Sequence, residues 1–176
     1  MRIYFDMDGT IADLYGVENW LNDLRTEKTT PYETATPLCD LERATDLLNE
    51  LKELGYSVGI ISWTSKGGSK EYNARVRKAK KEWLKREFPI QFEEIHIVKY
   101  GTRKDYVANE KNAIIFDDDN SVREFWINRG GIAFNPIEEN IIEILEKIIE
   151  KSVYNGFFLI LFLRRNTSQK NYCNIF

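Results

Sequence analysis

The strongest structural signal in the sequence is RIYFDMDGT, residues 2–10. The apolar run at residues 3–5 predicts a short buried strand. Two carboxylates, Asp6 and Asp8, follow this strand at once, and Gly9 then allows the backbone to turn sharply. Burying ionised carboxylates is costly unless a cation or hydrogen-bond donors compensate their charge. We therefore interpret the acidic pair as a chemical site rather than as a packing feature.

Four further apolar segments predict strands at residues 56–62, 94–98, 112–116 and 131–134. Segments with helical periodicity separate these strands along the chain. Alternating strands and helices are typical of an α/β fold with a parallel sheet and right-handed crossovers. We expect a Rossmann-like, five-stranded parallel sheet sandwiched by helices, with its active site beyond the carboxyl ends of the strands.

A second acidic cluster, Asp117-Asp118-Asp119, follows the strand predicted at residues 112–116. Adjacent carboxylates repel one another and raise each other's pKa unless a cation is bound. A helix cap would need only one aspartate. Oxygen ligands suit Mg²⁺, which binds through one or two carboxylates and keeps several waters. The cluster therefore predicts a Mg²⁺ site.

The strand at residues 56–62 ends in the hydroxyl and glycine residues of SWTSKGGS, residues 62–69. A helix is predicted to begin directly after them. Free backbone N–H groups and the positive end of a helix favour an anion at such a junction. We interpret Ser62 and Trp63 as part of a phosphate-binding loop, although an ordinary polar loop would show a similar pattern.

These segments, in this order, resemble the signature motifs of the haloacid dehalogenase (HAD) superfamily of phosphotransferases. The resemblance covers residues 1–150 and implies the sheet order 3-2-1-4-5, which sets Asp6 beside Asp117. It also requires a lysine before the second acidic cluster. Lys104 fits on the first turn of a predicted helix, and Lys99 remains the alternative.

The resemblance implies a Mg²⁺-dependent phosphomonoester hydrolase that forms an aspartyl-phosphate. Asp6 would be the nucleophile, and Asp8 would protonate the leaving group and then activate water. The implied phosphate-binding residues are Ser62, Trp63 and Lys104. The implied metal site comprises Asp6, Asp8 (through its main-chain carbonyl), Asp117 and Asp118, with Asp119 as an alternative to Asp118. Small members of the superfamily include 5′(3′)-nucleotidases, so a small phosphorylated substrate such as a nucleotide is expected.

Residues 13–38 leave room for a small cap or flap over the site, but not for a large lid domain. Helical periodicity predicts one helix within residues 11–30, followed by a loop at 31–38. Trp20 would lie in the core on this helix. The alternative is that Trp20 lines a substrate pocket together with Tyr32 and Trp63.

A long helix is predicted over residues 69–88, with Tyr72, Val76, Ala79, Trp83 and Leu84 facing inward. The outer face is basic: Lys70, Arg75, Arg77, Lys78, Lys80, Lys81, Lys85 and Arg86. We interpret this face as solvated. Steering of a phosphorylated or polynucleotide substrate is the alternative, but aromatic side chains are not interleaved on it, which disfavours nucleic acid.

The composition fits a globular protein with one main domain. The 176 residues are 43% hydrophobic and 30% charged, and the net charge of −3 excludes a large basic field. Cys39 and Cys173 are too few for a disulfide framework, and the single histidine, His96, disfavours a histidine-rich metal site. With no signal segment recognised, we expect a cytoplasmic protein that contacts no membrane.

Two other function classes fit part of the pattern. A signalling receiver domain also gathers acidic residues, a hydroxyl and a lysine around Mg²⁺, but there the lysine comes last. A catalytically idle binding protein with the same fold is the other alternative, although every catalytic position is filled here.

Residues 151–176 form a C-terminal tail of unassigned role, beyond the resemblance. Its apolar run at residues 157–163 is far shorter than the roughly 20 residues that a membrane-spanning helix needs. We expect this run to add an edge strand or to pack beneath the sheet.

Overall fold

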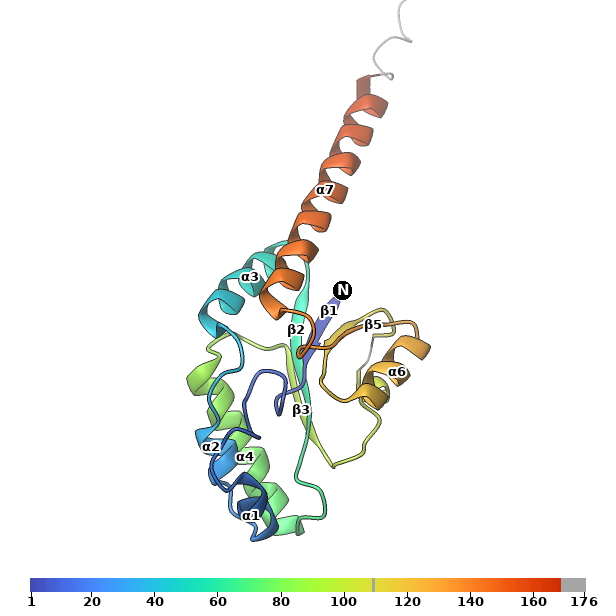
Figure 1. Cartoon of the computed structure of the whole chain (residues 1–176). Coiled ribbons are helices and arrows are strands. Elements are labelled where there is room, and N and C mark those ends of the chain that lie inside the picture. Colours follow the sequence, from blue (N-terminus) through green and yellow to red (C-terminus); the bar gives the residue numbers. More distant parts are fainter. Residues whose placement is uncertain (109, 169–176) are drawn as a thin grey trace, which may run out of the picture.

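A computed structural model describes residues 1–108 and 110–168. Its centre is a sheet of five parallel strands in the order β3-β2-β1-β4-β5. The strands are β1 (Arg2–Phe5), β2 (Ser57–Trp63), β3 (Glu94–Val98), β4 (Ile114–Phe116) and β5 (Ile132–Phe134) (Figure 1). The predicted fold class and strand order are thus confirmed.

Helices cover both faces of the sheet because the side chains of each strand alternate between two apolar clusters. In β1, Ile3 and Phe5 pack on one face with α3 (Leu41–Glu53), α4 (Lys70–Glu87) and the first turns of α7 (Ile141–Ser168). Tyr4 points to the other face, where it packs with α6 (Asn120–Asn128) and the segment around α5 (Lys104–Val107). Both faces of β1 are therefore buried, as expected for a central parallel strand.

The segment between β1 and α3 differs from its prediction. It forms two short helices, α1 (Trp20–Arg25) and α2 (Thr30–Thr34), rather than one helix and a loop. The chain leaves the helical conformation at Glu27, whose φ is 56°. Pro31 then lies in the first turn of α2, where its missing N–H costs no hydrogen bond. Pro31 thus lies in the first turn of a helix and not in the predicted loop at 31–38.

Helix α4 holds this segment in place. The Tyr72 hydroxyl donates to the Lys28 carbonyl at 2.9 Å, and the Trp83 indole donates to the Ala35 carbonyl at 2.7 Å. Tyr32 and Leu14 pack against the same side of α4. Figure 1 shows α1 and α2 beside α4, on the side of the molecule away from α6. We refer to residues 13–38 as the flap.

Helix α7 contains the apolar run at residues 157–163, so the prediction of an edge strand there is wrong. Ile141, Leu145 and Ile149 pack into the core at its start, and Figure 1 shows the helix continuing beyond the sheet. Residues 169–176 of the predicted tail lie outside the described residues. Among the helices that the structure describes, none is long and apolar enough to span a membrane.

Candidate active site

The carboxyl ends of β1 and β4 bring the two acidic motifs together. Phe5 pairs with Phe116 in the sheet, and the Asp6 N–H donates to the Phe116 carbonyl at 2.9 Å. Asp6 therefore leaves the sheet directly beside Asp117. Residues more than a hundred positions apart in sequence thus meet at one edge because the strands are parallel neighbours.

Three carboxylates converge at this edge. One oxygen each from Asp6, Asp117 and Asp118 lies within 4.8 Å of the others. Burial, together with the charge of Asp6, raises the pKa of Asp118 to about 6 and also raises the pKa of Asp117. The Asp6 Oδ1 atom is buried and has no hydrogen-bond partner among the described residues. An all-oxygen cluster with a buried, unsatisfied oxygen fits a hard divalent ion such as Mg²⁺.

Gly9 makes room for this cluster. Its φ of 74° lies in the left-handed region, and a Cβ at this position would come within 2.5 Å of Asp118 Oδ2. Any other residue would displace the Asp118 carboxylate or the turn that carries Asp8. The glycine of the DMDGT motif is thus explained by a close approach as well as by a sharp turn.

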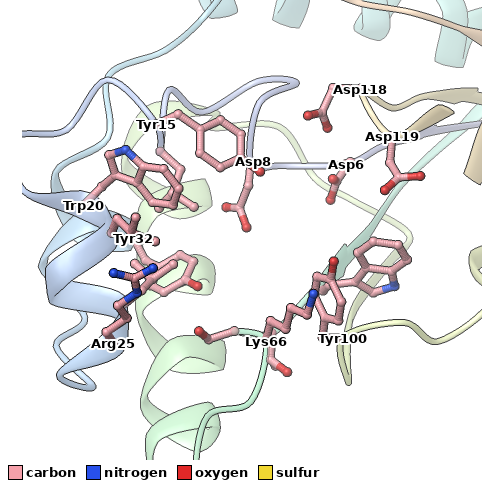
Figure 2. A pocket seen from close by; sticks show the side chains of 16 residues that line it. Asp6, Asp8, Tyr15, Trp20, Arg25, Tyr32, Lys66, Tyr100, Asp118 and Asp119 are labelled. Carbon is pink, nitrogen blue, oxygen red and sulfur yellow. The ribbon is translucent and has the colours of Figure 1, made fainter. Parts of the chain in front are cut away.

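Asp118 and Asp119, which the sequence left as alternative metal ligands, have different partners in the structure. The Asp119 carboxylate caps α6 by accepting hydrogen bonds from the N–H groups of Ser121 and Val122, at 2.9 and 3.1 Å. These bonds lower the pKa of Asp119, outweighing its partial burial. Asp118 instead faces Asp6, as Figure 2 shows.

Lys104, rather than Lys99, lies in the cluster. The fully buried Lys104 ammonium donates to Asp117 Oδ2 at 2.7 Å and lies 3.0 Å from Asp6 Oδ2. Burial lowers the pKa of Lys104, but the charges of Asp6 and Asp117 outweigh burial and hold it above its usual value. Lys99 is exposed. Lys104 therefore sets a fixed positive charge against Asp6 and Asp117.

Lys80 was predicted on the solvated face of α4, and that prediction is wrong. Its side chain is only 1% exposed. The Lys80 ammonium donates to Asp8 Oδ2 at 2.6 Å, to Ser62 Oγ at 2.8 Å and to the Trp63 carbonyl at 2.7 Å. A signal was available, because Lys80 follows Val76 and precedes Leu84 by four residues each, on the buried stripe of the helix.

The Asp8 side chain consequently faces Lys80 and not the three-carboxylate cluster. Burial raises the pKa of Asp8, and the nearby Asp6 charge adds to this, while the Lys80 ammonium opposes it. Only the main-chain carbonyl of Asp8 remains as its candidate metal ligand. Its carboxylate is available for proton transfer.

The loop after β2 lies beside this pair. Ser62 is fully buried, and the Trp63 indole donates to the Thr102 carbonyl at 2.8 Å. The Trp63 ring lies 4.7 Å from the Lys104 ammonium. Thr64, which was not predicted as a site residue, has a buried hydroxyl with no partner among the described residues. An unsatisfied hydroxyl in a pocket wall can donate to an oxyanion.

A cavity of about 620 Å³ opens directly onto these groups. Asp6, Asp8 and Asp118 line one end, and aromatic side chains line its walls: Tyr15, Trp20, Tyr32, Trp63 and Tyr100 (Figure 2). Trp20 is half-buried and packs edge-on against Tyr15, with ring centroids 5.1 Å apart. It therefore lines the pocket, and its predicted core position is wrong because α1 is too short to bury it.

Comparison with known proteins supports the fold. No family model and no curated protein matches the chain. The crystal structure of a HAD family enzyme from Bacteroides thetaiotaomicron aligns with a TM-score of 0.51 and 12% identity, covering 81% of this chain and 97% of that one. A structure of the same enzyme in complex with magnesium and inorganic phosphate aligns with a TM-score of 0.46 and 12% identity, covering 76% and 92%. The sheet order and the first of these two matches together show that the chain has a HAD-like fold.

Proposed function

We propose that the protein is a Mg²⁺-dependent phosphomonoester hydrolase that works through a phosphorylated Asp6. One observation carries the proposal. Asp6 lies among Asp117, Asp118 and Lys104, and its carboxylate borders an open cavity. A nucleophilic carboxylate needs positive charge around it to approach a phosphate, and Lys104 together with the Mg²⁺ that the carboxylates would hold would supply that charge.

The residues that would hold Mg²⁺ are Asp6, Asp117, Asp118 and the Asp8 main-chain carbonyl. When bound, the ion would neutralise charge on the phosphoryl group and on the attacking carboxylate. One crystal structure of the Bacteroides enzyme, which shares this fold, is a complex with magnesium and inorganic phosphate. That complex accords with the proposal for this chain.

The reaction proceeds in two displacements. Asp6 attacks phosphorus, forming an O–P bond while the bond from phosphorus to the leaving oxygen breaks, and Asp8 donates a proton to that oxygen. A water molecule then attacks the aspartyl-phosphate, Asp8 takes its proton, and inorganic phosphate leaves with Asp6 restored. Each proton passes through the same carboxyl group, which explains why Asp8 stands apart from the metal cluster.

The remaining polar groups of the site would bind the phosphoryl group or orient the residues that contact it. Lys104 reaches Asp6 and would balance charge on the phosphoryl oxygens as they approach. Thr64 and Ser62 would donate hydrogen bonds to those oxygens. Ser62 is fully buried, and because its hydroxyl oxygen accepts from Lys80, its own hydrogen is still free to be donated. Lys80 is thus a positioning residue for both Ser62 and Asp8.

The aromatic walls favour a substrate with a planar ring. Trp20 and Tyr15 come from the flap side, while Trp63 and Tyr100 pack together on the opposite side with ring centroids 4.9 Å apart. Rings stack on such surfaces without strong dependence on their substituents. We therefore propose a nucleotide or a comparable aryl phosphate as the substrate, which is a nucleotidase-like activity.

The test is release of inorganic phosphate from a panel of nucleotides, aryl phosphates and alkyl phosphates. We expect Mg²⁺-dependent release that stops with a chelator and falls at least about 10³-fold in Asp6→Asn. Asp13→Asn, an acidic residue of the flap that binds the Gly16 N–H, is the matched control and should keep full activity. Activity that survives Asp6→Asn or persists in chelator would contradict the mechanism.

A further inference from the structure

Arg25 stands out among the arginines of the described side chains. Every other one donates at least one hydrogen bond to another residue. Arg25 has no hydrogen bond and no ion pair with any described residue, although the chain carries more acidic than basic residues. It lies at the end of α1 and lines the cavity. A guanidinium left without a partner in a pocket wall is available for a ligand.

Lys66, in the loop after β2, likewise makes no hydrogen bond or ion pair with any described residue. It also lines the cavity, and its ammonium lies 5.4 Å from the centre of the Tyr100 ring, with no carboxylate within ion-pair distance among the described residues. Figure 2 shows Arg25 and Lys66 on the side of the pocket away from Asp6 and Asp118. They reach it from two different parts of the chain, the flap and the β2–α4 loop.

The pocket therefore has two ends of opposite charge. All the carboxylates that line it, Asp6, Asp8, Asp118 and Asp119, belong to the proposed catalytic end. The far end carries the two cations, with aromatic rings between the ends. Arginine pairs with a phosphate or carboxylate through two parallel hydrogen bonds, so it selects a planar or tetrahedral oxyanion.

We propose that the far end of the pocket is a subsite for a second negatively charged group of the substrate. The substrate class is then a ring-containing phosphomonoester that bears a second phosphate or a carboxylate, with a nucleoside bisphosphate as one form. This inference rests on the proposed function for the identity of the cleaved group. Arg25 is the main recognition residue, and Lys66 adds charge beside it.

The experiment measures binding without turnover. Asp6→Asn protein with Mg²⁺ is titrated with adenosine 5′-monophosphate and adenosine 3′,5′-bisphosphate, and separately with phenyl phosphate and 4-carboxyphenyl phosphate, by calorimetry. We expect the member of one pair that carries the second anionic group to bind about 10-fold more tightly. Adding Arg25→Met should remove that preference and leave the affinity for the ligand with one anionic group unchanged. The pair that shows the preference identifies the second group as phosphate or carboxylate.

Arg43→Met is the matched control, because Arg43 pairs with Glu146 and does not line the cavity. It should leave both affinities unchanged. Equal binding within both pairs, or equal losses for both ligands in Arg25→Met, would overturn the subsite. A preference for the second anion in a wild-type protein that hydrolyses nothing would instead overturn only the proposed function, so the two failures are distinguishable.

Discussion

The two ends of the cavity are built in different ways. At the strand ends, Asp6, Asp117 and Lys104 are buried, and the Lys104 ammonium pairs with both carboxylates. On the flap, Trp20 is half-buried, and Arg25 is exposed with no hydrogen bond or ion pair to any described residue. Groups fixed by the sheet suit a reaction that needs exact placement, whereas groups on a short helical segment suit recognition of one substrate among many. Substitutions at the first end should affect every substrate, and those at the second only some.

The largest effect is expected for Lys104→Met. Removing this cation leaves Asp6 and Asp117 buried without a fixed counter-charge, which should lower the free energy of unfolding by about 3 kcal/mol without Mg²⁺. Hydrolysis should fall at least about 10³-fold for all substrates. Thermal melting and phosphate release check both effects. Lys99→Met is the matched control, and a similar loss there would contradict the assignment of the lysine.

Lys80→Met should separate substrates by their leaving groups. Without Lys80 the Asp8 carboxyl is free to turn away, so proton donation should suffer by about 10²-fold for alkyl phosphates. A p-nitrophenyl leaving group needs little protonation, so the initial burst of p-nitrophenol should change much less. Rapid-mixing kinetics measure both, with exposed Lys81→Met as control. An equal loss for both leaving groups would mean that Lys80 acts on folding or binding instead.

Asp118 and Asp119 provide a test between adjacent residues. Asp118→Asn should raise the Mg²⁺ concentration needed for half-maximal activity about 10-fold or more, because a candidate ligand loses its charge. Asp119→Ala should leave that concentration unchanged and cost about 1 kcal/mol of stability, since a helix cap is lost. Metal titrations and urea unfolding distinguish the two. The reverse pattern would place the metal on Asp119.

On the flap, Trp20→Ala should raise KM for nucleotides about 5- to 10-fold through lost stacking. It should not change kcat, nor KM for a small alkyl phosphate such as glycerol phosphate. Steady-state kinetics with the two substrates check this. A drop in kcat for both substrates would show that the flap takes part in the chemistry and would remove the contrast between the two ends.

The smallest effect is a pH dependence of metal binding. The pKa of Asp118 is raised to about 6 and that of Asp117 is also raised, against about 3.9 in an unfolded chain. Between pH 4 and pH 8, the metal-free folded protein therefore binds more protons at Asp117 and Asp118 than the unfolded chain does. Its free energy of unfolding consequently falls as pH rises through this range. Mg²⁺ binds the ionised form, so it should raise Tm more at pH 8 than at pH 5.5. An equal gain at both pH values would exclude these carboxylates as ligands.

The strand-end groups could be predicted from the sequence because buried parallel strands are apolar runs, and a polar residue just after such a run has few other places to lie. Asp6, Ser62 and Asp117 follow this rule. Lys80 does not, since a lysine among seven other basic residues on a helix resembles a solvated face unless its register against Val76 and Leu84 is followed. The flap was mispredicted because its helices are stabilised by contacts with α4 and not by their own periodicity.

The most direct test of the central claim is a crystal structure of the wild-type protein with Mg²⁺ and beryllofluoride, a mimic of a phosphoryl group on a carboxylate. We expect beryllofluoride attached to Asp6, the ion held among Asp6, Asp117 and Asp118, and Lys104 against the fluorides. A structure in which Mg²⁺ and beryllofluoride at saturating concentration leave Asp6 unmodified would contradict it.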